Sequence, residues 1–338
     1  MISKKLQSVF YMNFNEPVVG SLVVGEYLYV LGSTLYKCKL DGDEIEESVT
    51  LATIENPSSI ATDGTFLYIV VTREGLTTGT RIAVVRISDF TLRLISADIS
   101  TSTRYIGRMS CDSLGFLHTV FRPDDSTNSR WRIYNYDSDL NTIVMTKEIN
   151  PGNSLRELHA KSNLIYMAGT TTVRTSVYSW DGVNETLVST FPLTTGRLVL
   201  HDSKIISMNV AASPSIRYLH AFSLNEDNEL IQEHTNDVGM NGQRVFGIVS
   251  GGQYLYIHGD TLSNLYVVTY ENTEFNILDV IALPETFIAD YDYPNTLFFA
   301  NNRLYIVNGD YIRVFRWKAH AEFTYEKTGS RTYKFTAL

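Results

Sequence analysis

The sequence predicts an all-β protein, a single seven-bladed β-propeller of four-stranded antiparallel blades whose ring is closed by the N-terminal strand. Three observations predict it. Residues alternate with the period of a strand, one strand motif returns seven times, and a segment near the N-terminus matches the end of the first repeat. The 21 Tyr and 16 Phe among 338 residues agree, because aromatic residues favour strands.

The repeating unit is clearest in residues 252–278, GQYLYIHGDTLSNLYVVTYENTEFNIL. Aromatic and aliphatic residues alternate in QYLYIHG, a Gly-Asp loop follows, and LYVVTY leads through the polar ENTE turn to FNIL. Period-2 alternation interrupted by Gly, Asn and Asp is typical of antiparallel strands. The unit is therefore predicted to contain three successive strands.

The first strand of this unit has seven copies. They are GEYLYVLG at 25–32, GTFLYIVV at 64–71, LGFLHTVF at 114–121, NLIYMAG at 163–169, KIISMNV at 204–210, QYLYIHG at 253–259 and RLYIVNG at 303–309. Successive copies are 39, 50, 48, 41, 49 and 49 residues apart. A short apolar strand precedes the copies, as in SIAT, LVLH and LFFA. Four strands per unit at this period indicate propeller blades, which we label a to d from the centre outward.

The ends of the chain indicate how the ring closes. SVFYMNFNEP at 8–17 matches SVTLATIENP at 48–57, which ends the first blade, so 8–17 is predicted to be an outer strand that completes the last blade. Segments 321–326 and 331–338 are the other candidates for that place. The expected blades are 18–56, 57–102, 103–153, 154–194, 195–242, 243–285 and 286–338. Joining the first and last strands removes an open sheet edge.

In architecture this pattern resembles the WD-repeat and kelch propellers. No blade carries the Gly-His and Trp-Asp pair of the WD family, since Trp180-Asp181 lies in one turn only, and the paired glycines of kelch occur once, as Gly251-Gly252. The resemblance covers essentially the whole chain. It implies a fold and no particular activity.

Loop lengths and charges distinguish the two faces of the predicted ring. The b–c loops of blades two to five and several d–a loops are long, and long loops on a rigid scaffold usually carry binding. Arginines stand where strands leave that face, whereas acidic residues crowd the opposite face. We therefore expect a basic face for an anionic partner, such as an acidic glycan, a phosphate or a carboxylate-rich protein surface. The arginines are Arg81, Arg104, Arg130, Arg156, Arg174, Arg197, Arg217 and Arg244. The alternative is that they cap loop carbonyls and pair with nearby acids.

Composition excludes some classes of function. The formal net charge of −9 argues against a basic surface for sequence-specific nucleic-acid binding. No apolar run approaches the roughly 20 residues that span a bilayer, and the N-terminus does not have the pattern of a cleaved signal peptide. We expect a cytoplasmic protein, or a virion component if the source is viral. Cys38 and Cys111 have no metal or redox spacing and are expected to be free thiols.

Motifs for catalysis or metal binding are absent from the sequence. The seven His residues form no metal-ligand spacing, although His159 and His201 occupy equivalent turns of adjacent blades. There is no nucleophile elbow, phosphate loop or calcium loop. Asp290 and Asp292 are the best acid/base candidates, because a glycosidase needs paired carboxylates. No cofactor and no metal are expected.

The favoured interpretation is a non-catalytic interaction or scaffold propeller that binds a protein partner or an anionic ligand through the arginine-bearing face. It fits a structural subunit of a larger assembly, for instance a phage tail. Two alternatives stay open: an enzyme acting on acidic glycans with Asp290 or Asp292 and an arginine, and a carbohydrate-binding receptor-recognition module.

Overall fold

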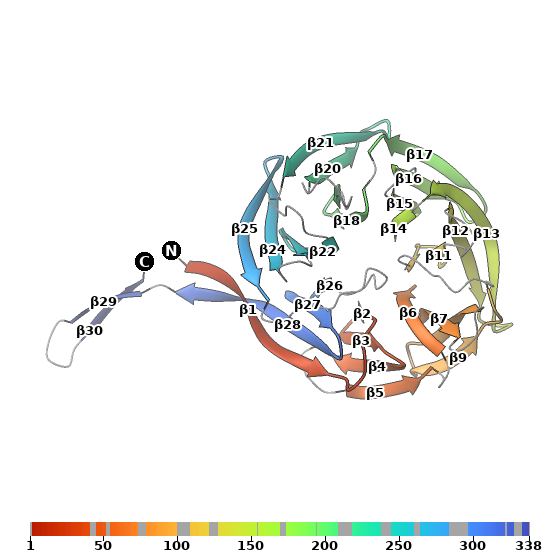
Figure 1. The fold of residues 1–338 in the computed structure, drawn as a ribbon, viewed down its shortest axis with the longest axis horizontal. Coiled ribbons are helices and arrows are strands. Elements are labelled where there is room, and N and C mark those ends of the chain that lie inside the picture. The colour runs from red at the N-terminus through yellow and green to blue at the C-terminus, as the bar shows by residue number, and fades with distance from the viewer. Residues whose placement is uncertain are drawn as a thin grey trace.

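A computed structural model describes residues 2–40, 45–51, 55–73, 79–99, 109–121, 128–153, 155–169, 174–193, 195–208, 218–237, 245–259, 264–283, 297–321, 323–327 and 333–337. These residues form seven four-stranded antiparallel sheets arranged in a ring and one separate two-stranded sheet (Figure 1). The predicted fold class, an all-β seven-bladed propeller, is confirmed.

Each of the first six blades uses four consecutive strands, running from strand a near the centre to strand d at the rim. Blade 1 contains β2 (Gly20–Val24), β3 (Tyr27–Leu31), β4 (Thr34–Lys39) and β5 (Ile45–Thr50). Blade 2 contains β6 (Glu55–Thr62), β7 (Phe66–Arg73), β8 (Thr80–Arg86) and β9 (Thr91–Ile95). Blade 3 contains β10 (Met109–Cys111), β11 (Leu117–Phe121), β12 (Asn128–Asp137) and β13 (Thr142–Asn153).

Blades 4 to 6 continue the ring in the same order. Blade 4 contains β14 (Leu155–Lys161), β15 (Leu164–Gly169), β16 (Thr175–Trp180) and β17 (Glu185–Phe191). Blade 5 contains β18 (Arg197–His201), β19 (Lys204–Met208), β20 (Tyr218–Leu224) and β21 (Leu230–Asp237). Blade 6 contains β22 (Val245–Gly251), β23 (Tyr254–Gly259), β24 (Asn264–Glu271) and β25 (Glu274–Ala282).

Blade 7 joins the two ends of the chain. Its first three strands are β26 (Leu297–Ala300), β27 (Arg303–Asn308) and β28 (Tyr311–Ala321), and its outer strand is β1 (Ile2–Asn13), antiparallel to β28. The predicted closure by the N-terminal strand is therefore confirmed. The C-terminal candidates do not complete the blade: β29 (Phe323–Lys327) and β30 (Tyr333–Ala337) pair with each other in a hairpin outside the ring (Figure 1).

One β-bulge recurs in the outer strand of every blade, β1 included. At each one the register against strand c shifts by one residue, so that one residue of the outer strand is extra. A bulge bends the strand and increases its twist, which blunts an exposed sheet edge. The shared bulge shows that β1 is equivalent to the other outer strands. The extra residues are Val9, Glu46, Arg93, Thr146, Val188, Glu233 and Leu278.

The core lies between the blades. Buried apolar side chains of strands a to c form clusters at each junction, because the alternating residues of a sheet face the neighbouring blade on both sides. At the closing junction, Met12 and Phe14 pack with Leu28, Tyr305 and Ile312. The N-terminal strand is thus part of the core and not only of the rim.

Neighbouring inner strands contact each other around the centre of the ring, from β2 and β6 through to β26 (Figure 1). No helix in the described residues is long and apolar enough to cross a membrane. Cys38 and Cys111 are both free, as predicted.

Candidate functional site

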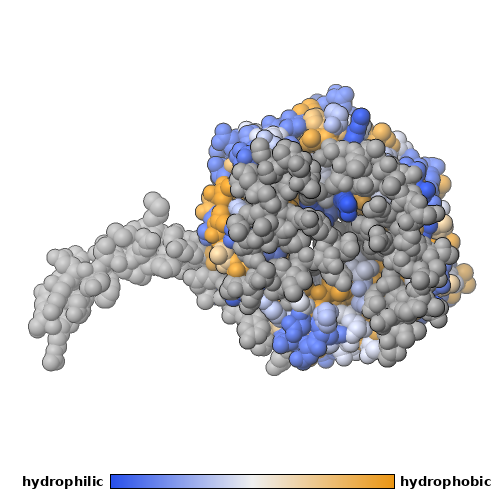
Figure 2. Space-filling view, in the orientation of Figure 1, coloured by the Kyte–Doolittle hydropathy of each residue, from blue (hydrophilic) through white to orange (hydrophobic). Residues whose placement is uncertain are grey.

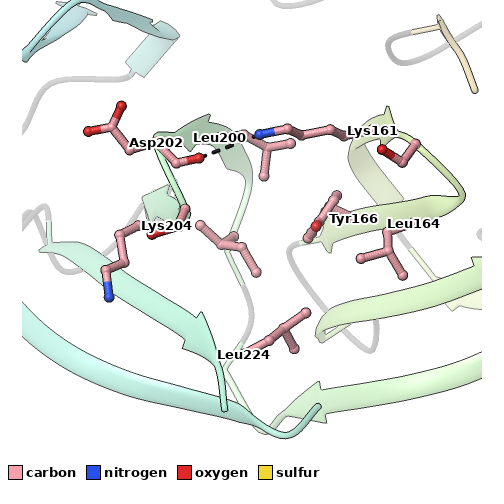
Figure 3. A pocket seen from close by; sticks show the side chains of 10 residues that line it. Lys161, Leu164, Tyr166, Leu200, Asp202, Lys204 and Leu224 are labelled. Atoms are coloured by element: carbon pink, nitrogen blue, oxygen red, sulfur yellow. Dashed lines mark hydrogen bonds between the residues drawn. The ribbon is translucent and has the colours of Figure 1, made fainter. Parts of the chain in front are cut away.

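A cleft of about 200 Å³ lies between blades 4 and 5, on the face that carries the a–b turns (Figure 3). Leu164 and Tyr166 form one wall, because residues two apart on a strand share a side. Leu200 and Ile205 come from blade 5, and Leu224 closes the cleft on the outer side. An apolar cavity with a few polar groups at its mouth is the usual composition of a binding site.

Lysines border the mouth of the cleft. Lys161 Nζ donates to the main-chain oxygen of Asp202 at 3.5 Å, which links the a–b turns of the two blades (Figure 3). Lys204 forms an ion pair with Glu233, the bulge residue of β21, and the Tyr270 hydroxyl donates to the other oxygen of that carboxylate at 3.0 Å. Because Lys204 has an acidic partner of its own, Lys161 supplies the more available positive charge at the mouth.

Glu233 stays ionised in this arrangement. Burial acts to raise its pKa, but hydrogen bonds from Lys204, Ser223 and Tyr270 outweigh burial and hold the pKa below its usual value. Glu233 is the extra residue of the bulge in β21, and its contact with Tyr270 places its carboxylate at the junction of blades 5 and 6. The carboxylate therefore holds Lys204 of blade 5 and Tyr270 of blade 6 together at the junction of these two blades.

A second cluster of charges joins the inner strands of the same two blades. The Arg197 guanidinium lies 3.2 Å from Glu157, and His159 Nε2 lies 3.4 Å from the other Glu157 oxygen. The Glu157 side chain is 0% exposed and that of Arg197 is 9% exposed. A buried charge needs a close partner of opposite sign, so Arg197 stabilises the blade junction.

A hydrogen-bonded chain in blade 3 contains the Asp-His pair that many catalytic sites use. His118 Nε2 lies 3.0 Å from Asp112 Oδ2, and Trp131 Nε1 donates to His118 Nδ1 at 3.1 Å. Since Nδ1 accepts a hydrogen bond, the ring proton is on Nε2 and is donated to Asp112. Burial lowers the pKa of His118, although Asp112 opposes this, so the ring is neutral.

The burial of these hydrogen-bonded side chains indicates a structural role and not a catalytic one. The Asp112 and His118 side chains are both 0% exposed, and an indole takes the place that a nucleophile would have. Sequence reasoning missed Asp112. A repeat comparison would have found it, because Asp63 of blade 2 has the same role: its carboxylate accepts from the amides of Thr65 and Phe66 and from the Tyr68 hydroxyl.

The arginines predicted for the binding face are in different environments. Arg81 pairs with Asp98 at 2.8 Å and Arg130 lies 3.4 Å from Glu148. Arg156 is half-buried on β14, whereas Arg174 is exposed just before β16. Arg104, Arg217 and Arg244 lie outside the described residues. Of the predicted arginines that the structure describes, Arg174 is therefore the one best placed to meet a partner.

The residues predicted as alternatives for catalysis and metal binding are Asp290 and Asp292, and His159 and His201. Asp290 and Asp292 lie outside the described residues. His201 Nδ1 lies 2.8 Å from Ser250 Oγ of the next blade, so His159 and His201 contact different residues. Within the described ranges, His, Cys, Asp and Glu form no group of three that could hold a metal ion. Burial raises the pKa of the Cys38 thiol to about 12, which keeps it protonated.

Comparison with known proteins agrees with the architecture. No family model and no curated protein matches the sequence. Among solved structures, the WD40 repeats of RRP9 superpose with a TM-score of 0.67 at 8% identity, over 93% of this chain and 100% of that chain. The Cps50 (Swd1) β-propeller domain of Myceliophteria thermophila gives 0.69 at 8%, over 92% and 99%. A chain of the mitotic checkpoint complex gives 0.68 at 10%, over 92% and 94%. At such low identity these similarities establish the propeller fold alone.

Proposed function

We propose that this chain is a non-catalytic interaction propeller that binds a protein partner. The observation that carries the proposal is the cleft between blades 4 and 5, where apolar walls from Leu164, Leu200 and Leu224 lie beneath the Lys161 ammonium. This arrangement suits a peptide that inserts an apolar side chain and places a neighbouring Asp or Glu near Lys161. A chain with the same fold occurs within the mitotic checkpoint complex, and this supports an interaction role.

The long-loop face is the second surface that we propose, for an anionic partner. The exposed guanidinium of Arg174 supports it, because an arginine without burial can pair with a carboxylate, sulfate or phosphate at little desolvation cost. More specifically, we propose that the chain is a structural subunit of a larger assembly, such as a phage tail.

Selection from a random peptide library on the immobilised full chain tests the cleft. We expect enriched peptides to carry an apolar residue beside Asp or Glu, and Lys161→Ala to weaken their binding about tenfold, which corresponds to about 1.4 kcal/mol. Gln253→Ala is the matched control, since Gln253 is exposed in the equivalent turn of blade 6. Fluorescence anisotropy measures each affinity. If the affinity of the selected peptides is unchanged in Lys161→Ala but is lost in Arg174→Ala, the binding site lies on the long-loop face instead.

A further inference from the structure

The shared bulge marks an equivalent position near the end of strand c in every blade. This position is two residues beyond the strand c residue at which the register with the outer strand shifts. It is aromatic in blades 3, 4, 6 and 7 and aliphatic in blades 1, 2 and 5. The aromatic residues are Tyr136, Trp180, Tyr270 and Trp317, and the aliphatic ones are Leu40, Ile87 and Leu224.

An aromatic residue at this position meets strand b of the preceding blade. At the junction of blades 6 and 7, Trp317 Nε1 donates to the Tyr256 hydroxyl at 2.7 Å, beneath apolar residues of both blades. The rim of the ring in Figure 2 covers these junctions. Two further junctions have ring contacts of the same kind, with centroids 6.4 and 6.2 Å apart: Tyr68 with Tyr136, and His118 with Trp180.

Where the strand c residue is aliphatic, another ring of the chain can supply the contact. At the junction of blades 7 and 1, which contains Leu40, the Phe298 ring stacks on Tyr305 with centroids 4.6 Å apart. At the junction of blades 1 and 2, the Phe90 ring lies 5.9 Å from that of Tyr29. Both tyrosines therefore have an aromatic partner within the chain.

The junction of blades 4 and 5 differs from these. Its strand c residue is Leu224, and Tyr166 is the equivalent of Tyr256 in strand b. Among the described residues, no ring contacts Tyr166 and no group forms a hydrogen bond with its hydroxyl. The side chain is only 8% exposed, and Figure 3 shows it among the walls of the cleft. Because leucine is shorter than tryptophan, the cleft lies where the Trp317 indole lies at the junction of blades 6 and 7.

The size and chemistry of the cleft suit an aromatic side chain. A cavity of about 150 Å³ holds a benzene ring, and the cleft has a volume of about 200 Å³. A phenol hydroxyl both donates and accepts hydrogen bonds, and a buried polar group without a partner costs free energy. A ring that carries an N–H or O–H group satisfies Tyr166, whereas a phenylalanine ring fills the space and leaves the hydroxyl without a partner.

We propose that the residue which a partner inserts into the cleft is a tryptophan or a tyrosine that donates a hydrogen bond to the Tyr166 hydroxyl, as Trp317 donates to Tyr256. This inference rests on the proposed function, because it assigns the apolar residue of the bound peptide. The Asp or Glu beside that residue lies near Lys161 at the mouth. The partner is therefore a protein segment with a tryptophan or tyrosine next to an acidic residue.

The first test needs no partner. Leu224→Trp should fill the cleft from within the chain and raise the midpoint of urea denaturation, followed by circular dichroism. The gain should be smaller when Tyr166→Phe is also present, since the two residues would be in contact. Leu40→Trp is the matched control and should lower the midpoint, because Phe298 already packs on Tyr305 there and overpacking destabilises. A Leu224→Trp midpoint at or below that of the natural chain would overturn the proposal.

Four peptides provide the second test. They have the sequence acetyl-Gly-Asp-Xaa-Gly-amide with Trp, Tyr, Phe or Leu at Xaa, and isothermal titration calorimetry measures their affinity for the full chain. We expect the Trp and Tyr peptides to bind about fivefold to tenfold more tightly than the Phe peptide, and Tyr166→Phe to remove this difference. Leu224→Trp should abolish the binding of all four.

The outcomes separate this inference from the proposed function. If all four peptides bind equally and Lys161→Ala still weakens them, the cleft binds peptides as proposed but the assignment of tryptophan or tyrosine is wrong. If none of the four binds, the proposed function of the cleft fails and this inference fails with it.

Discussion

Gly251 is the position where the structure makes the sharpest stability prediction. It ends β22, the inner strand of blade 6, directly beneath the ring of Phe299 in blade 7. A Cβ added to Gly251 would lie 2.2 Å from Phe299 Cγ and 2.4 Å from Cδ2, whereas Cβ atoms essentially never approach another atom within 3.0 Å. Gly251→Ala therefore requires the ring or the strand to move.

The ring has little freedom to move. Phe299 is stacked on Tyr256 with centroids 5.5 Å apart, and the buried Tyr256 hydroxyl accepts a hydrogen bond from Trp317 Nε1 at 2.7 Å. Overpacking of this kind costs about 1–3 kcal/mol. We expect Gly251→Ala to lower the free energy of unfolding by that amount, measured by urea denaturation followed through tryptophan fluorescence.

Two further variants separate the clash from other effects of the substitution. Gly252→Asn is the matched control: Gly252 has φ +59° with nothing within 4 Å of an added Cβ, and Asn tolerates the left-handed region, so a change below about 0.5 kcal/mol is expected. Replacing Phe299 by Leu in the Gly251→Ala background should recover part of the loss, since residues in contact are not additive. If Gly251→Ala unfolds like the natural chain, the packing argument is wrong.

The remaining predictions concern closure, charge and pH. Deleting residues 1–13 removes β1 and should abolish cooperative thermal unfolding, as followed by circular dichroism. Deleting residues 322–338 should leave the ring intact. Equal melting curves for both deletions would contradict the role of β1 in closing the ring. Arg197→Met should lower the free energy of unfolding by about 3–5 kcal/mol, because it leaves the Glu157 charge buried without its arginine. Adding Glu157→Gln should recover much of this loss in urea denaturation. A double variant no more stable than Arg197→Met would refute the role of the buried pair. Burial lowers the pKa of His220 to about 4, against 6.5 for an ordinary His, so the unfolded chain binds the proton more tightly than the folded chain does. The free energy of unfolding therefore falls as pH drops from 6.5 to 4, by at most about 3 kcal/mol. Urea midpoints at several pH values should therefore fall less steeply in His220→Phe.

The charge pairs show where prediction from sequence ends. Arginines at the strand entries are visible in the repeat, yet Arg197 meets Glu157 across 40 positions and Lys204 meets Glu233 across 29. A linear pattern gives the side of a strand on which a residue lies. It does not give the depth at which two blades pack, and that depth decides whether an arginine is buried in a pair or left exposed like Arg174.

The sequence by itself determined that the chain forms seven repeats of short antiparallel strands. Side chains of a strand alternate between its two sides, so apolar residues recur at every second position, and the turns between strands favour Gly, Asn or Asp. It also indicated that β1 is an outer strand. The tertiary structure decided between β1, which the sequence favoured for blade 7, and the two C-terminal segments, since all three have strand patterns and a pattern does not specify a pairing partner. The β28 edge accepts one strand, β1 takes it and buries Leu6 and Met12, and the C-terminal strands are left to pair with each other outside the ring.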